Sequence, residues 1–115
     1  MEFSQGDIIW VNLDPTKGTE IKKNRPCIVV SNNQYNHYFN TIMVIPISSA
    51  SKYVELAKYK VSPLFMTIEK KHVHGTALLQ HIRTIDPTKR TNGLVIDQLD
   101  QQECQSLMAT IRQFI

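Results

Sequence analysis

The 115-residue sequence predicts a single mainly β domain, spanning residues 1–115, with one α-helix at its C-terminal end. Two observations support this fold class. Short runs of β-branched and aromatic residues alternate with turn-forming and charged residues through most of the chain, which is typical of strands joined by short connections. The C-terminal part instead repeats its apolar residues at helical spacing. Successive short strands followed by one helix favour a small antiparallel barrel or sandwich over alternating βαβ units.

The first part of the chain contains successive predicted strands. Residues 8–13 are rich in β-branched and aromatic residues and end before a proline that disfavours continued regular structure. Residues 27–30 follow Pro26, which is tolerated at a strand start because its missing N–H need not be paired there. Residues 41–47 are almost wholly apolar, as in a strand buried on both faces. Ser48 lies at the end of this third run.

Residues 52–96 give weaker signals of further β structure. Apolar positions recur at short intervals in residues 52–68 with Ser62-Pro63 interrupting, and we expect two short strands there. Residues 76–82 form another candidate strand. Pro87–Arg90 predicts a turn or a single helical turn, followed by a brief apolar segment at residues 94–96.

A capping box predicts where the C-terminal helix begins. Asp100 is followed three residues later by Glu103, so the two side chains can satisfy backbone N–H groups of a first helical turn. Leu107, Met108 and Ile111 then repeat at helical spacing. We therefore expect a helix with one apolar face to close the chain.

The composition fits a soluble globular protein, with 42% hydrophobic and 20% charged residues. The net charge of +3 permits attraction to phosphate, but it is equally common in proteins with no nucleic-acid role. We expect Cys27 and Cys104 to be reduced and structural, and Trp10 to lie in the core or in a dimer interface. No signal peptide or membrane-spanning run is evident, so a cytoplasmic protein is expected.

Three blocks of sequence resemble the MazF/PemK toxin family. Residues 6–20, GDIIWVNLDPTKGTE, followed by Arg25-Pro26, are similar to the opening signature of the family, and IPISS at 45–49 and IRTID at 82–86 follow in the same order. The resemblance implies a small SH3-like antiparallel β-barrel of the MazF/PemK/CcdB toxin kind with a C-terminal helix. It also implies a homodimeric, sequence-specific endoribonuclease of a type II toxin–antitoxin system. Such an enzyme cleaves single-stranded mRNA without a metal or another cofactor and so inhibits translation and growth.

The implied reaction uses the ribose 2′-hydroxyl as nucleophile and leaves a 2′,3′-cyclic phosphate and a 5′-hydroxyl, so the protein must move protons and stabilise phosphorane charge. By resemblance, Arg25 occupies the family's catalytic arginine position, where its permanent charge can bind phosphate through two parallel hydrogen bonds. Ser48 lies where relatives carry threonine; its hydroxyl can contact the phosphate or stabilise the following turn, with Ser49 as a substitute. Glu20 matches a family glutamate that could accept the 2′-hydroxyl proton or hold Arg25 in place.

Basic and aromatic residues make up most of the predicted RNA-binding set. Residues 17–23 form a lysine-rich loop beside Arg25, and residues 52–60 interleave lysines with tyrosines, a mixture that suits a phosphate track with base stacking. An ordinary exposed strand face explains the second group equally well. The expected RNA-binding residues are Lys17, Thr19, Lys22, Lys23, Ser49, Lys52, Tyr53, Gln80 and His81.

Gln80 departs from the family pattern, because relatives often carry aspartate or glutamate there and an amide cannot act as a base near neutral pH. His81 titrates in the right range, but neighbouring strand residues point to opposite faces, so it is not expected to replace position 80. His72 and His74 would share one face of a strand and could bind a metal. The sequence shows no third ligand at convincing spacing, so a surface pair is expected and no metal site is predicted.

Two other functions stay open at the sequence level, because one fold can host several activities. CcdB-like proteins of the same fold poison DNA gyrase by binding, but they act through a C-terminal tail that contains tryptophan, whereas this chain ends RQFI. An inactive relative that only binds RNA or an antitoxin is the other alternative, motivated by Gln80. The resemblance also implies a cognate MazE/PemI-like antitoxin, through which alone the toxin would contact DNA.

Overall fold

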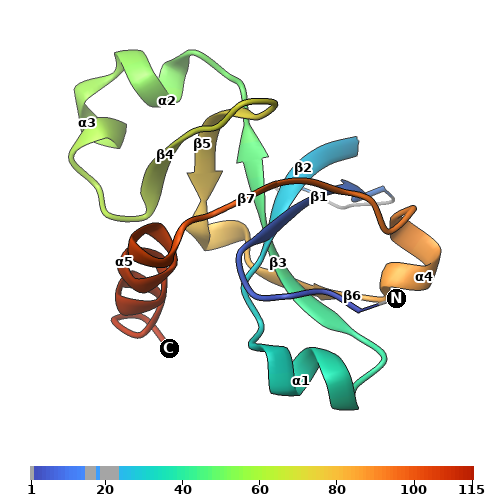
Figure 1. The fold of residues 1–115 in the computed structure, drawn as a ribbon. Coiled ribbons are helices and arrows are strands. Elements are labelled where there is room, and N and C mark those ends of the chain that lie inside the picture. The colour runs from blue at the N-terminus through green and yellow to red at the C-terminus, as the bar shows by residue number, and fades with distance from the viewer. Residues whose placement is uncertain (1, 15–17, 19–23) are drawn as a thin grey trace.

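The computed structural model describes residues 2–14, 18 and 24–115, and its strands form one curled antiparallel sheet (Figure 1). The described strands are β1 (Asp7–Asn12), β2 (Asn24–Val29), β3 (Ile42–Ser48), β4 (Phe65–Glu69), β5 (His74–Leu78), β6 (Arg83–Ile85) and β7 (Val95–Gln98). The helical segments are α1 (Asn33–Tyr38), α2 (Lys52–Glu55), α3 (Ala57–Lys60), α4 (Pro87–Arg90), α5 (Gln101–Ile111) and a single 3₁₀ turn, η1 (Leu79–His81). This confirms the predicted mainly β fold with a C-terminal helix.

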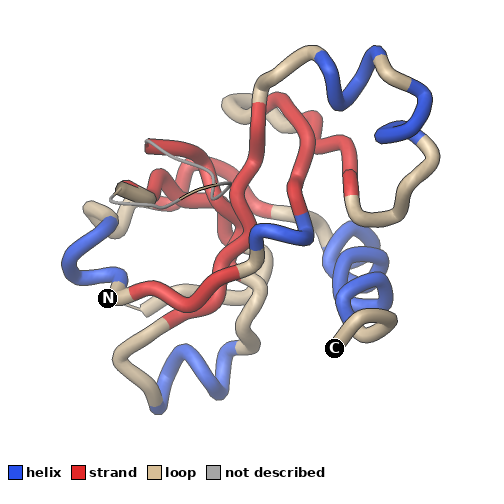
Figure 2. The backbone as a smooth tube through the Cα atoms, turned by 180° about the vertical axis from the view of Figure 1, so that it is seen from behind, coloured by secondary structure: helices blue, strands red, loops and turns tan. Residues whose placement is uncertain are grey.

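The sheet has the strand order β4-β5-β3-β2-β1-β7, with β6 as an additional partner of β3. On one side β3 pairs with β2, where Cys27 lies opposite Pro46. On the other side it pairs with β6 near its start and with β5 near its end, where Ser48 lies opposite Thr76. The view from behind shows that the sheet curls into a half-barrel (Figure 2).

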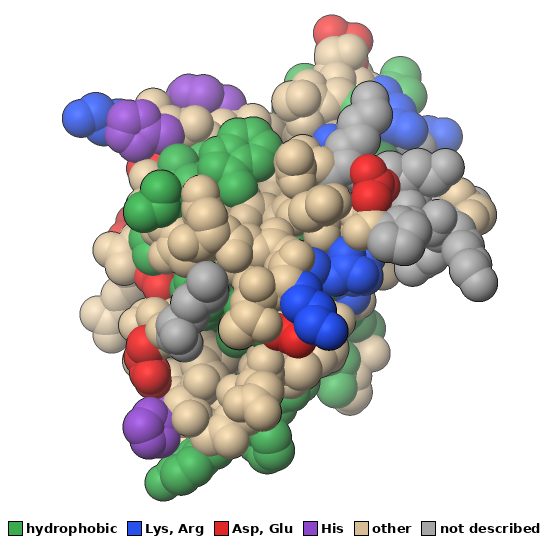
Figure 3. Space-filling view, turned by 90° about the vertical axis from the view of Figure 1, so that its right-hand side faces the viewer, with side chains coloured by type: hydrophobic (Ala, Val, Ile, Leu, Met, Phe, Trp, Pro, Cys, Tyr) green, Lys and Arg blue, Asp and Glu red, His purple; other side chains and the backbone are tan. Residues whose placement is uncertain are grey.

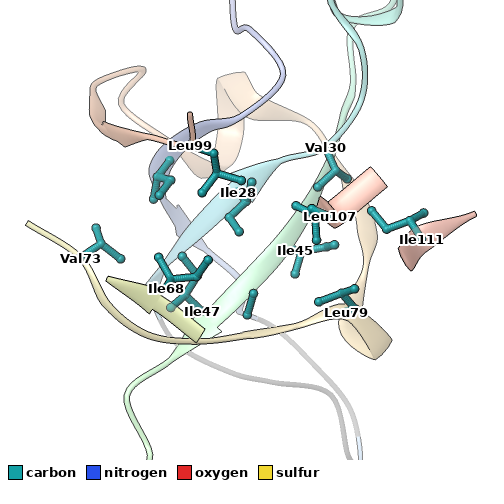
Figure 4. Close-up of a cluster of buried hydrophobic side chains, with 12 residues drawn as sticks. Ile28, Val30, Ile45, Ile47, Ile68, Val73, Leu79, Leu99, Leu107 and Ile111 are labelled. Carbon is teal, nitrogen blue, oxygen red and sulfur yellow. The ribbon is translucent and has the colours of Figure 1, made fainter. Parts of the chain in front are cut away.

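Both faces of β3 are buried, as its almost continuous apolar sequence predicts. Ile45 and Ile47 point with Ile28 into a cluster that α5 covers with Leu107 and Ile111 (Figure 4). The alternate positions of β3 face a second cluster, formed by Phe3, Ile9, Val11, Leu13, Cys27, Val29, Ile42, Val44 and Ile85. Because successive side chains of a strand point to opposite faces, the same strands contribute side chains to both hydrophobic clusters.

The C-terminal helix begins at the predicted capping box. The Glu103 backbone N–H donates to Asp100 Oδ1 at 2.7 Å, and the Asp100 N–H donates to Glu103 Oε1 at 2.9 Å. Glu103 also forms an ion pair with Lys70, which joins the helix to the segment after β4. Both Leu107 and Ile111 are buried, so the apolar face predicted for this helix is confirmed.

The prediction of two strands in residues 52–68 is wrong for the first of them, because residues 52–60 form the short helices α2 and α3. Leu, Ala, Glu and Lys dominate this segment and are good helix formers, while its spaced apolar residues gave a misleading strand signal. The strand expected at 76–82 ends at Leu78 and gives way to η1. Helix α1 was not predicted; it is capped by Asn32 Oδ1, which accepts from the Tyr35 N–H at 2.8 Å.

Within the part of the chain that the structure describes, every helix is too short or too polar to cross a membrane.

Leu107→Ala should destabilise the protein by about 2–5 kcal/mol, because it removes a fully buried side chain between α5 and the sheet. Gln105→Ala, on the exposed side of the same helix, is the matched control and should change stability by no more than about 0.5 kcal/mol. Urea unfolding measures both. Equal effects at the two positions would contradict the docking of α5 described here.

Candidate functional site

Arg25 is held in β2, where it pairs with Val11 of β1 and is half-buried. Residues two apart in a strand share a face, so its side chain lies on the same face as Cys27. Burial raises the pKa of the Cys27 thiol to about 12, and the positive charges of Arg83 and Arg25 oppose this rise. The positive charges of both guanidinium groups therefore influence the thiol electrostatically.

Ser48 is the last residue of β3 and is only 4% exposed. Its Oγ accepts a hydrogen bond from the Ala50 N–H at 3.2 Å, so the turn-stabilising role that the sequence left open is present. That bond uses one lone pair of the oxygen and leaves the hydroxyl proton for another acceptor. The local structural role and a phosphate contact are therefore compatible.

The register of β2 and β3 brings Arg25 and Ser48 to the same end of the sheet. Cys27 and Pro46 form the last pair of the β2–β3 ladder, and an in-register continuation by two residues on each strand would set Arg25 opposite Ser48 on the same face. Side chains that are directly opposite have Cβ atoms about 4.5–5.5 Å apart. This continuation would place a permanent positive charge beside a hydroxyl donor, an arrangement suited to an anion such as phosphate.

A groove of about 310 Å³ opens at this end of the sheet. It is lined by Trp10, Asn24, Arg25, Pro26, Ile47, Ser49, His72, Val73 and His74. Trp10 is 50% exposed, so the core position is wrong, and the other expected position, a dimer interface, stays a prediction. Figure 3 shows a face of the molecule on which hydrophobic side chains gather next to histidines. An exposed indole in a groove offers a flat surface on which an unpaired base can stack.

His72 and His74 are both exposed, which confirms their predicted surface position, but β5 begins at His74, so the expectation that they share a strand face is wrong. His74 Nδ1 forms a hydrogen bond with Glu69 Oε2 at 2.8 Å, and the His72 backbone N–H donates to Asp97 Oδ2 at 2.9 Å. Among the described residues, no three His, Cys, Asp or Glu side chains are grouped so that they could hold a metal ion. The sequence did not reveal that both histidines line the groove that contains Arg25.

Gln80 and His81 are not brought to Ser48. They lie in η1, which follows the C-terminal end of β5, whereas Ser48 pairs near the start of that strand. Each strand residue in between adds about 3.4 Å to the separation. Because η1 is not a strand, the argument that these two side chains must point to opposite faces does not hold.

The remaining predicted site residues fall into three groups. Lys52 and Tyr53 begin α2, where Lys52 Nζ lies 5.0 Å from the centroid of the Tyr53 ring and this ring stacks on Phe65 at 5.4 Å. Ser49 lines the groove itself. Glu20, Lys17, Thr19, Lys22 and Lys23 lie outside the described residues.

Two arginines that the sequence did not place in the site hold the end of β1. Arg90 Nη1 donates to the carbonyl oxygens of Asn12 and Asp14, both at 2.9 Å, and Arg83 Nη1 donates to that of Leu13 at 3.3 Å. With Lys89 they line a second cavity of about 420 Å³. Figure 3 shows a group of Lys and Arg side chains near the middle of this face. Arg90 gives no sequence signal, because its partners lie more than seventy residues earlier.

Comparison with solved structures defines the class of protein. The chain is similar to MazF from Deinococcus radiodurans, with a TM-score of 0.77 and 20% identity over 98% of this chain and 96% of that one. It is also similar to an endoribonuclease solved in complex with its cognate antitoxin from a mycobacterial species, with a TM-score of 0.72 and 12% identity over 96% of this chain and 92% of that one. The fold is thus that of the MazF-type toxins, as the sequence predicted.

Sequence comparison identifies the family. The profile of the PemK-like, MazF-like toxin of type II toxin–antitoxin systems matches residues 4–115. The endoribonuclease toxin ChpB of Escherichia coli K12 is 32% identical over 114 residues, which cover 96% of this chain and 95% of ChpB. The endoribonuclease toxin MazF of the same strain is 31% identical over 80 residues, or 70% of this chain and 65% of MazF. The chain belongs to the PemK-like, MazF-like toxin family, which confirms the family predicted from its motifs.

We expect the Cys27 thiol of the folded protein to resist maleimide at about pH 8, because burial excludes the reagent and raises the thiol pKa to about 12. Cys104 is partly exposed, and its pKa is raised by burial and by the nearby Glu103 and Asp100 carboxylates. It should therefore react more slowly than an ordinary exposed thiol but faster than Cys27. Mass spectrometry of labelled peptides measures both rates, with urea-unfolded protein as the control. Equal labelling of the two cysteines in the folded protein would contradict the placement of Cys27.

Proposed function

We propose that this chain is a sequence-specific, metal-independent endoribonuclease toxin that cleaves single-stranded RNA. The observation that carries the proposal is the position of Arg25 in a groove with Trp10 at the end of the sheet, where the β2–β3 register, continued past its last pair, would bring Ser48 opposite it. Family membership supports the same activity, because ChpB and MazF of Escherichia coli are named endoribonuclease toxins. Cleavage of mRNA would inhibit translation and growth.

In the proposed reaction, the ribose 2′-oxygen attacks the adjacent phosphorus and the bond from phosphorus to the 5′-oxygen breaks. The 2′-hydroxyl loses its proton to a base and the 5′-oxygen gains one, which leaves a 2′,3′-cyclic phosphate and a 5′-hydroxyl. Arg25 stabilises the negative charge on the nonbridging oxygens, and the Ser48 hydroxyl donates to one of them. Glu20 stays our candidate for the base or for a residue that holds Arg25.

The groove is proposed to hold the unpaired nucleotides that flank the scissile phosphate. Trp10 offers a stacking surface, while Ser49, His72 and His74 supply polar contacts around it. Lys52 and Tyr53 extend the track beyond the end of β3. Lys17, Thr19, Lys22 and Lys23 stay predicted contacts to the RNA backbone, and Gln80 and His81 stay predicted contacts farther along the strand.

The proposed protein partner is a MazE/PemI-like antitoxin that neutralises the toxin. Structures of MazE with MazF from Deinococcus radiodurans and of a mycobacterial endoribonuclease with its cognate antitoxin support this proposal. We propose further that the toxin works in the cytoplasm as a homodimer and contacts DNA only through the antitoxin.

Arg25→Ala should lower the rate of RNA cleavage by about 10²–10³-fold or more, because it removes charge stabilisation that matters most in the transition state. Arg25→Lys keeps the charge but not the two parallel donors, so it should restore only part of the activity. The assay uses long single-stranded RNA with EDTA, sequencing of fragment ends and detection of the cyclic phosphate.

The matched control for this test is Arg112→Ala, which changes an exposed arginine at the end of α5 and should cleave normally. Urea unfolding checks that each variant is folded. Full activity of folded Arg25→Ala would remove Arg25 from the mechanism. No cleavage by the folded unmodified protein on any RNA would instead favour a CcdB-like binding toxin or an inactive RNA-binding relative.

Binding of RNA should weaken as salt is added, with the logarithm of the association constant falling by about 0.7 per phosphate contact for each unit of log salt concentration. Lys22→Ala and Lys23→Ala should each make this slope shallower by about one contact. A substrate with 2′-deoxyribose at the scissile nucleotide permits measurement without cleavage. A slope near zero, or one unchanged in both variants, would argue against the basic loop as the RNA track.

A further inference from the structure

A buried threonine lies directly beside the proposed catalytic serine. Thr76 is only 2% exposed, and its Oγ1 atom has no hydrogen-bond partner within the described part of the chain. A buried hydroxyl without a partner destabilises the folded state, because it has lost its hydrogen bonds to water. Such groups are rare in folded proteins and require a specific explanation.

The sheet register connects this hydroxyl to Ser48. Thr76 lies opposite Ser48 on β3 and opposite Thr67 on β4, so the three side chains form one row on one face of the sheet. Cross-strand pairs of Thr and Ser at this spacing can form hydrogen bonds between their hydroxyl groups. Thr67 is exposed, whereas Thr76 and Ser48 are both buried.

Gly75 permits the close approach of the two strands. A Cβ atom at position 75 would lie 2.5 Å from the Ser48 carbonyl oxygen, which is closer than real Cβ contacts allow. The backbone of β5 is therefore packed tightly against the last residue of β3. The position of Thr76 relative to Ser48 is consequently set by the backbone and not by adaptable loops.

We propose that Thr76 is a positioning residue that orients the Ser48 hydroxyl toward the scissile phosphate, an inference that rests on the proposed function. Ser48 Oγ already accepts from the Ala50 N–H, which leaves one lone pair and one proton. A rotation about χ1 of Thr76 lets its hydroxyl donate to that second lone pair. With both lone pairs occupied, the Ser48 O–H bond has one orientation left, in which it donates to a nonbridging phosphate oxygen.

This arrangement gives two advantages to a serine. Its side chain lacks a β-branch and can occupy several χ1 rotamers, so two donors that hold the oxygen restrict it to one of them. A hydroxyl that accepts hydrogen bonds is also polarised into a stronger donor. The cost in stability of leaving Thr76 unpartnered in the free protein is the kind of trade-off found at functional sites.

The test compares Thr76→Val, which removes only the hydroxyl at almost constant shape, with Thr76→Ser, which keeps it. Single-turnover cleavage by Thr76→Val should be slowed by about 10-fold, the effect of one lost hydrogen bond, while KM stays nearly unchanged. Its urea midpoint should equal or exceed that of the unmodified protein. Thr76→Ser should restore most of the rate, and Thr67→Val, the matched control in the same row, should have no effect on it.

A double-mutant cycle tests whether Thr76 acts through Ser48. If it does, Thr76→Val should not slow cleavage further when Ser48→Ala is already present. Full activity of Thr76→Val, or independent effects of the two substitutions, would overturn the inference while leaving the proposed function intact. Full activity of Ser48→Ala would overturn both the proposed role of Ser48 and the inference that depends on it.

Discussion

The pairing of β3 with three other strands is the constraint on which the rest of the structure depends. Its start is bound to β6, its middle to β2 and its end to β5, so one strand joins the first and last parts of the chain. A slip of one residue would exchange the faces of Ile45 and Val44 and would also turn Ser48 away from Arg25. Core packing and site geometry are therefore enforced by the same register.

The sequence was most informative where local pattern and burial agree. The apolar runs around Trp10, Ile28 and Ile45 predicted β1 to β3 because β-branched residues fit a strand packed on both faces. The capping box at Asp100 predicted the start of α5, since that motif is complete within one helical turn. Arg25 and Ser48 were instead selected by their match to the MazF/PemK signature; both lie just outside the predicted strands 27–30 and 41–47, and the structure includes them in β2 and β3.

Other features depend on contacts between distant residues and gave weaker signals. The helices α2 and α3 were missed because a segment of one helical turn carries too few apolar positions to distinguish a helix from a strand. Trp10 was expected in the core or in a dimer interface; its exposure in the chain could not be predicted, because the burial of a strand residue depends on which neighbours cover it. Thr76 looked like an ordinary strand residue, and the role proposed for it follows only from the partner opposite it.

The site combines groups that differ in how they are held and in whether they titrate. Arg25 and Ser48 are presented by paired strands, and neither changes protonation in the proposed reaction near neutral pH. Their contribution to the rate should consequently vary little with pH. Any pH dependence of the cleavage step would then report on the groups that move protons, with Glu20 the candidate from the sequence. In the sequence, Glu20 follows the end of β1, where Arg83 and Arg90 donate hydrogen bonds to backbone carbonyl oxygens. Because the charge-binding groups and the candidate base belong to different parts of the sequence, substitutions could alter proton transfer without disturbing phosphate binding.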